Sequence, residues 1–158
     1  MSLWWSLHLR REAASVPLAR RLLLDTMETA GVDPDISFEL SVALTEACAN
    51  AVEHGGTRDR PQDAYRVTAY LDGEMCRIEV ADSGPGFPLA TIERPTTRGY
   101  VPDVVDTSDA DPDYAEHGRG LGLIEEIADH VWFANRDGAV VSFDKILKWR
   151  TDSPLVTV

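Results

Sequence analysis

The amino-acid sequence predicts an α/β protein, a two-layer sandwich with three helices on one face of a mixed sheet of about five strands. Two patterns carry this prediction. Apolar and polar residues alternate in several short segments, which is typical of half-buried strands, and longer segments carry apolar residues at helical spacing. A chain of 158 residues is long enough for a core that needs no disulfides.

Composition narrows the classes of function. Fifteen basic residues stand against 27 acidic ones, for a net charge of −12. This balance argues against direct nucleic-acid contact, which needs clustered Lys and Arg, and favours partners with basic patches. Cys48 and Cys76 lack metal-type spacing, so we expect buried free thiols. No long apolar run and no secretory signal pattern is present, so we expect a cytoplasmic protein without membrane contact.

The first strand and helix follow from the N-terminal third of the sequence. Residues 3–9 alternate between apolar and polar, which predicts a strand. Ser15 is the expected N-cap of a helix that has Pro17 in its first turn and ends at Gly31. The apolar stripe of this helix is Val16, Ala19, Leu23, Met27 and Ala30.

A second helix should start with Asp33 as its cap and Pro34 at its first position, and end at Gly55. Helical spacing gives it one core-facing stripe. The stripe consists of Leu40, Leu44, Ala47, Cys48 and Ala51.

A row of polar residues follows a neighbouring face of this helix. Glu46, Asn50 and His54 are spaced four residues apart, so they lie one above another. A carboxylate, an amide and an imidazole in a row suit a site that handles a metal, a phosphate or a proton. A solvated polar face is the alternative, and His54 also fits a helix C-terminus for dipole reasons alone.

The next segments predict a hairpin that ends in an aspartate. Residues 65–71 and 76–80 alternate in hydrophobicity on either side of an Asp72-Gly73 turn. Because strand side chains alternate, Asp82 continues the inward phase of the second strand. An inward carboxylate is costly unless something hydrogen-bonds it, so Asp82 indicates a site.

The region from about 88 to 117 loses all periodicity and fills with Pro, Asp, Thr and Gly. Loops of roughly 30 residues in a compact domain are usually lids, binding loops or disordered inserts. We expect a mobile lid, with an insert of no function as the alternative. Beyond it, residues 118–123 should open a third helix, followed by strands at 131–134 and 139–147. The predicted single domain spans 1–149, and residues 150–158 form a short tail.

Two glycine-rich stretches bear on chemistry: Asp82-Ser83-Gly84-Pro85-Gly86-Phe87 at a strand end, and Gly118-Arg119-Gly120-Leu121-Gly122-Leu123 at a helix start. Free N–H groups and the dipole at a helix N-terminus attract phosphate, and glycines let a ligand approach closely. Neither stretch is a Walker loop. A polar helix face followed by these two stretches, in this order, is hard to obtain by chance.

Together these motifs resemble those of the GHKL (Bergerat) ATP-binding fold, shared by DNA gyrase, heat-shock chaperones, histidine kinases and mismatch-repair proteins. TEACANAVEHG at 45–55 resembles the N-box, 82–87 the first glycine box and 118–123 the second. Within that superfamily the sequence is most similar to bacterial anti-sigma-factor serine/threonine kinases of the RsbW and SpoIIAB type. The resemblance extends to about Leu147.

The resemblance implies a role for each matching residue. Asn50 would ligate a Mg²⁺ ion that bridges the ATP phosphates, and Asp82 would accept a hydrogen bond from the adenine amino group. Glu46 would be the catalytic general base that takes the proton from a partner's serine or threonine hydroxyl. The other implied ATP-binding residues are Gly84, Gly86, Gly118, Gly120, Leu121, Gly122 and, by a loose match, Ser142. Arg119, between the phosphate-loop glycines, is expected to neutralise a terminal phosphate, with an exposed loop arginine as the alternative.

The implied function is that of a Mg-ATP-dependent protein serine/threonine kinase and anti-sigma factor. Such a protein binds a sigma factor and phosphorylates a serine of a STAS-domain antagonist, commonly as a homodimer. One alternative is a nucleotide-dependent module that sequesters a partner without catalysis. A second is a detached histidine-kinase-like catalytic domain that needs a separate phosphoacceptor. A gyrase-type or chaperone-type ATPase clamp would need transducer domains that this length does not provide.

Overall fold

The computed structural model of the protein describes residues 2–56, 64–92 and 121–151. Residues 121–127 are helical. The expected lid from residue 93 onward, Gly118, Arg119, Gly120 and the tail from residue 152 lie outside the described residues. In chain order the elements are β1 (Leu3–Arg10), α1 (Ser15–Ala30), α2 (Pro34–His54), β2 (Ala64–Leu71), β3 (Met75–Ala81), α3 (Leu89–Ile92), β4 (His130–Asn135) and β5 (Ala139–Ile146).

The five strands form one sheet in the order β1-β2-β3-β5-β4, so the predicted α/β sandwich is confirmed. The expectation of a mixed sheet is wrong, because every neighbouring pair among these strands is antiparallel. Two helices, α1 and α2, separate β1 from β2, and together they return the chain to the end of the sheet where β1 finished. β5 then inserts between β3 and β4, which prevents these two strands from pairing.

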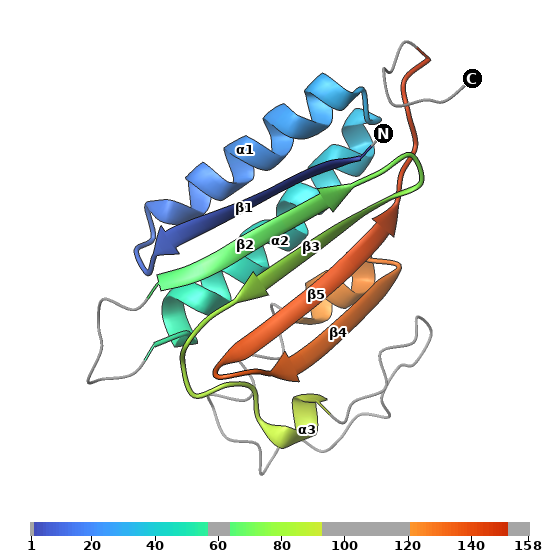
Figure 1. Ribbon diagram of the computed structural model, residues 1–158. Coiled ribbons are helices and arrows are strands. Elements are labelled where there is room, and N and C mark those ends of the chain that lie inside the picture. The colour runs from blue at the N-terminus through green and yellow to red at the C-terminus, as the bar shows by residue number, and fades with distance from the viewer. Residues whose placement is uncertain (1, 57–63, 93–120, 152–158) are drawn as a thin grey trace.

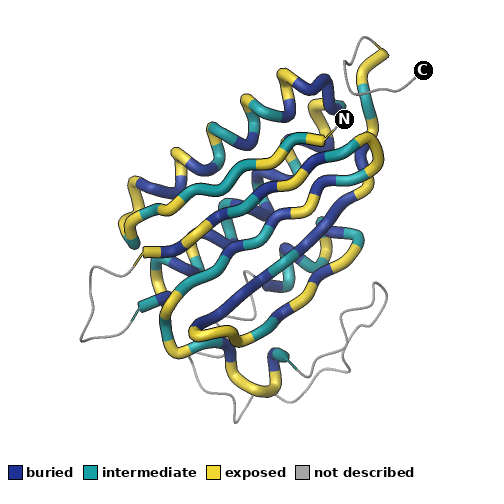
Figure 2. Tube along the Cα trace, viewed as in Figure 1, coloured by how far each residue is buried: buried dark blue, intermediate teal, exposed yellow. Residues whose placement is uncertain are grey.

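The sheet is covered on one side only (Figure 1). α1, α2 and the helix at 121–127 lie behind it in this view, and α3 lies beyond the ends of β4 and β5. Buried and exposed residues alternate along β2, as expected for a strand with one covered face (Figure 2). The largest fully buried side chains include Tyr65, Phe143, Leu23, Met27, Leu40 and Leu44.

The helix stripes are buried as predicted, but one of the two predicted caps is wrong. Asp33 caps α2, because its side chain accepts a 2.8 Å hydrogen bond from the Asp35 N–H. Ser15 is not the cap of α1. Its hydroxyl donates to the Glu12 carbonyl and shares a 2.6 Å hydrogen bond with the Tyr65 hydroxyl, so it serves the core contact between α1 and β2.

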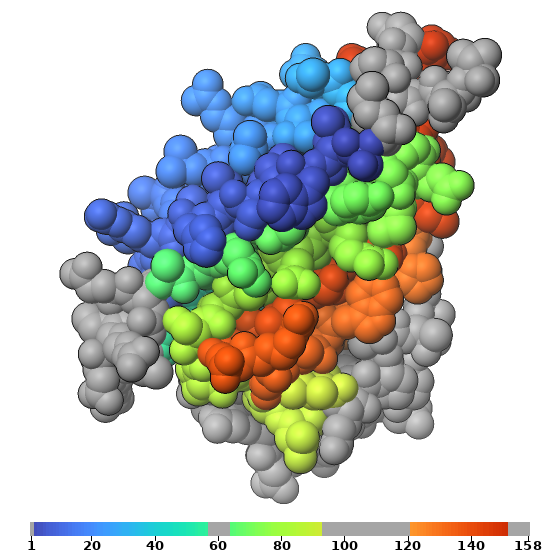
Figure 3. Space-filling model, in the orientation of Figure 1, coloured from blue at the N-terminus to red at the C-terminus, as the bar shows by residue number. Residues whose placement is uncertain are grey.

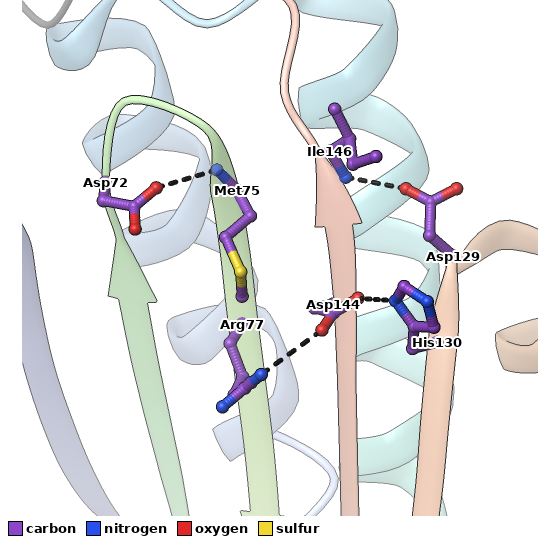
Figure 4. Close-up of polar contacts among 7 residues, drawn as sticks. All are labelled: Asp72, Met75, Arg77, Asp129, His130, Asp144 and Ile146. Carbon is purple, nitrogen blue, oxygen red and sulfur yellow. Dashed lines mark hydrogen bonds and ion pairs between the residues drawn. The ribbon is translucent and has the colours of Figure 1, made fainter.

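The uncovered face carries a polar cluster that links three strands (Figure 4). Asp144 on β5 is only 6% exposed. Its carboxylate lies 3.4 Å from Arg77 on β3 and 2.8 Å from Nδ1 of His130 on β4. The Arg77 guanidinium lies 5.3 Å from the centre of the Trp132 ring. In the space-filling view, this face is built from all five strands (Figure 3). Among the described helices, none has the length and apolar character needed to span a membrane.

Candidate functional site

One pocket brings together α2, the end of β3, the start of β5 and the helix at 121–127. Its polar lining residues are Asn50, His54 and Asp82. The remaining lining residues are Ala47, Ala51, Val80, Gly86, Phe87, Leu121, Ala139 and Val141. Mostly apolar walls with a few convergent polar groups are typical of a small-molecule site.

Asn50 is the polar residue of the pocket that most needs a ligand. The Nδ2 atom of its side chain is buried and has no hydrogen-bond partner among the described residues. A buried donor without a partner is costly, typically by about 1–3 kcal/mol. A bound phosphate oxygen could accept this hydrogen bond, and the amide oxygen is a ligand type that suits Mg²⁺.

Glu46 lies one helical turn before Asn50 and is half-buried. It is not among the residues that line the pocket. The four-residue spacing on α2 nevertheless places both side chains on the same side of the helix. Glu46 is therefore on the pocket side of α2, one turn before Asn50.

Asp82 is held in place by the backbone around it. Its N–H donates to the Ala139 carbonyl at 3.0 Å, and its Oδ1 accepts from the Ala139 N–H at 3.0 Å and the Gly84 N–H at 2.9 Å. No described residue donates to Oδ2. The inward carboxylate is thus partly satisfied by the protein, and one oxygen is left to accept a hydrogen bond from a ligand.

The first glycine box owes its glycines to contacts within the protein. A Cβ at Gly84 would lie 2.6 Å from the Gly55 carbonyl carbon. Gly86 has φ +87°, and a Cβ there would lie 2.7 Å from Oδ1 of Asn135. Gly86 lines the pocket, whereas Gly84 packs against the end of α2. The loop therefore reaches its place beside the pocket only because these side chains are missing.

Asn135 is a site residue that the sequence reading missed. Its Oδ1 accepts from the Phe87 N–H at 2.8 Å and its Nδ2 donates to the Phe87 carbonyl at 3.0 Å. The Phe87 ring, which lines the pocket, meets Phe133 edge-on at a centroid distance of 5.5 Å. Asn135 begins the sequence NRDG at 135–138, which predicts only a turn. No local sequence pattern predicts its hydrogen bonds to Phe87, 48 residues earlier.

The other expected site residues divide into three groups. Leu121 is buried and lines the pocket, as expected, and His54 lines it too, beyond its expected role at the helix end. Gly122 is described but is not part of the lining. Gly118, Arg119 and Gly120 lie outside the described part of the chain.

The expectation that Ser142 reaches the adenine side of the site is wrong. The register partners of Ser142 are Glu79 on β3 and Trp132 on β4, whereas its neighbours Val141 and Phe143 belong to the buried core. Because side chains alternate along a strand, Ser142 points to the uncovered face of the sheet. It is therefore on the opposite side from the pocket.

The two cysteines are buried, as expected, and are not reactive groups of the site. Burial raises the pKa of the Cys48 thiol and of the Cys76 thiol to about 12. Within the described ranges, no group of three or more His, Cys, Asp or Glu residues could hold a metal ion.

Comparisons with known proteins agree with this geometry. The family model described as the histidine kinase-like ATPase domain matches residues 9–145. The chain is 29% identical over 133 residues to the serine-protein kinase RsbW of Bacillus licheniformis, covering 84% of this chain and 78% of the relative. It is 25% identical over 142 residues to the serine-protein kinase RsbW of Staphylococcus epidermidis, covering 90% and 86%.

Two solved structures share the fold. The RsbU and RsbW domains of Rv1364c from Mycobacterium tuberculosis superpose with a TM-score of 0.61 at 19% identity, over 91% of this chain and 33% of that one. This chain thus spans about a third of that protein's length. The catalytic domain of the histidine kinase ThkA superposes with a TM-score of 0.52 at 15% identity, over 92% and 99% of the two chains.

Proposed function

Because the chain belongs to the histidine kinase-like ATPase domain family, we propose that it is a Mg-ATP-dependent protein serine/threonine kinase. One observation carries the proposal. The unpartnered amide of Asn50 and the held carboxylate of Asp82 line the same pocket from two different elements. The name of the relatives, serine-protein kinase, supports the kinase class.

The lining of the pocket supports a role for each of these residues. Asp82 accepts a hydrogen bond from the adenine amino group through Oδ2, while Val80, Phe87, Leu121 and Val141 exclude water from the base. Asn50 would hold Mg²⁺ through its amide oxygen. When bound, Mg²⁺ offsets the charge of the transferring phosphate. The family resemblance would assign the phosphates to the glycine stretch at 118–122 with Arg119, and a lid to 88–117, of which residues 93–120 lie outside the described part of the chain.

Glu46 is the proposed general base. It is half-buried on the pocket side of α2, and we propose that the serine or threonine of a second protein lies next to it. Its carboxylate takes the hydroxyl proton as the phosphoryl group transfers. A positioned base contributes about 10²–10⁴-fold to a rate.

We further propose that the partners are a sigma factor, which the protein holds inactive, and a STAS-domain antagonist, whose serine it phosphorylates. The resemblance to anti-sigma kinases supports this choice. It also favours a cytoplasmic protein that acts as a homodimer and makes no direct contact with nucleic acid.

A second candidate is a nucleotide-dependent binding module without catalysis. It is favoured by the position of Glu46, which is outside the pocket lining. A detached histidine-kinase-like catalytic domain has only the shared fold in its favour.

A pull-down from bacterial lysate with and without Mg-ATP, followed by transfer of labelled γ-phosphate and phosphosite mapping, separates these functions. Labelled serine on a captured STAS-domain protein supports the kinase. Nucleotide-dependent capture without label supports the binding module, and label on histidine supports the histidine-kinase-like domain.

A further inference from the structure

Arg11, in the turn between β1 and α1, belongs to none of the motifs. Its Nε donates to the Ala51 carbonyl at 3.2 Å and its Nη2 to the Val52 carbonyl at 2.7 Å. Both carbonyls are in the last turn of α2. The Ala51 carbonyl also accepts the Gly55 N–H at 2.9 Å, and Val52 is one of the last four residues, whose carbonyls lack the regular partner of a helix interior. The positive guanidinium also faces the negative end of the helix dipole. The Arg11 side chain thus caps the C-terminus of α2, the helix that carries Asn50 and His54.

Three glycines, Gly55, Gly56 and Gly84, lie between Arg11 and Asp82, and none of them has room for a Cβ atom. A Cβ at Gly56 would lie 1.8 Å from Nη1 of Arg11. A Cβ at Gly84 would lie 2.9 Å from the Gly56 nitrogen, and one at Gly55 would lie 2.8 Å from Cβ of Asp82. The end of α2 is therefore packed between the guanidinium on one side and the Asp82 loop on the other.

We propose that Arg11 is a positioning residue of the nucleotide site, an inference that rests on the proposed function. It fixes the last turn of α2 against the Asp82 loop and so sets the spacing between Asn50, on the phosphate side, and Asp82, on the base side. Asn50 directly precedes Ala51, one of the two residues whose carbonyls Arg11 holds. A ligand that contacts both side chains at once depends on that spacing, because small errors of position are expensive in a preorganised site.

The first test compares Arg11→Gln with Arg10→Gln, a matched control at the neighbouring exposed position. Calorimetric titration of Mg-ATP into Arg11→Gln should give a Kd about tenfold higher than that of the unmodified protein, as expected for the loss of a charged hydrogen-bond pair. Arg10→Gln should bind as the unmodified protein does. Arg11→Lys should be intermediate, since an ammonium group lacks the planar fork of donors. Equal affinity of Arg11→Gln and the unmodified protein overturns the inference.

The second test is a double-mutant cycle, which a merely structural role would not satisfy. If Arg11 acts through Asn50, Arg11→Gln should weaken Mg-ATP binding less in an Asn50→Ala background than in the unmodified protein. An equal loss in both backgrounds means that Arg11 acts independently of Asn50 and overturns the proposal.

A third measurement keeps the inference separate from the proposed function. In the nucleotide-free protein, Arg11→Gln should shift the NMR signals of the Asn50 side-chain amide and of the Gly55 and Gly84 amides, whereas Arg10→Gln should not. If the unmodified protein binds no Mg-ATP, the proposed function fails, but this comparison still tests the role of Arg11. Unchanged signals in Arg11→Gln overturn it.

Discussion

Glu46 and Asn50 lie one turn apart on α2 but should fail in different ways when they are changed. Glu46→Gln keeps the shape of the side chain and removes the base. We expect Mg-ATP binding to be retained and phosphoryl transfer to fall by about 10²–10⁴-fold. Single-turnover assays with labelled ATP, run beside a binding titration, measure both effects. Full transfer by Glu46→Gln would remove this residue from the mechanism.

Asn50→Ala should affect stability and binding in opposite directions. The change removes a buried Nδ2 that has no partner in the described part of the chain, and it places a better helix former in α2. We therefore expect the free energy of unfolding of the nucleotide-free protein to rise by about 1 kcal/mol, while Mg-ATP affinity falls. Urea unfolding and calorimetric titration measure the two quantities. A destabilised variant with unchanged affinity would show that Asn50 is a structural residue.

Some site residues could be predicted from the sequence and others could not, for physical reasons. Helix and strand periodicity fix the directions of the Asn50 and Asp82 side chains, and both residues line the pocket. Asn135 was missed because its partner is the backbone of Phe87, far away in the sequence. Ser142 was placed on the wrong side because its motif match took no account of the strand register that turns it toward Trp132.

At the scale of elements, we expect the end of β4 to hold the loop after β3 in position through Asn135. Asn135 makes both of its hydrogen bonds to Phe87, so Asn135→Ala should release the Phe87 wall of the pocket. We expect Mg-ATP affinity to fall about tenfold or more and the free energy of unfolding to fall by about 1–3 kcal/mol.

Asp33→Ala is the matched control for this change. It removes the cap of α2 at the end of the helix far from the pocket, so it should cost about 1 kcal/mol of stability. Affinity for Mg-ATP should stay the same. If the two variants lose stability alone and bind equally well, Asn135 does not shape the pocket.

The elements themselves were well predicted, since stripes and alternation report burial directly. The sequence does not predict whether neighbouring strands run parallel or antiparallel, because this depends on the order of the strands in the sheet. Nothing in β5 itself tells that it lies between β3 and β4. That insertion makes the sheet antiparallel throughout its described strands.

At the scale of the whole molecule, three buried groups should make stability depend on alkaline pH. Burial raises the pKa of Cys48 and Cys76 from 9.0 to about 12 and that of Tyr65 from 10.0 to about 12. The unfolded chain loses these protons first, so their contribution is fully present below about pH 9 and is lost as the pH rises toward 12.

We therefore expect the free energy of unfolding to fall steadily when urea denaturation is repeated from pH 8.5 to 10.5. The thiols should also resist a thiol reagent at pH 8 in the folded protein and react in urea. Rapid reaction of the folded protein would show that Cys48 and Cys76 are not buried.

The central claim is that Asp82 and Asn50 form one nucleotide site, and calorimetric titration of Mg-ATP tests it most directly. The unmodified protein should bind one Mg-ATP per chain. Asp82→Asn should bind at least about tenfold more weakly, because its amide can present a donor to the adenine amino group. Ser142→Ala, on the opposite face of the sheet, should bind as the unmodified protein does. Absence of binding by the unmodified protein, or undiminished binding by Asp82→Asn, would contradict the claim.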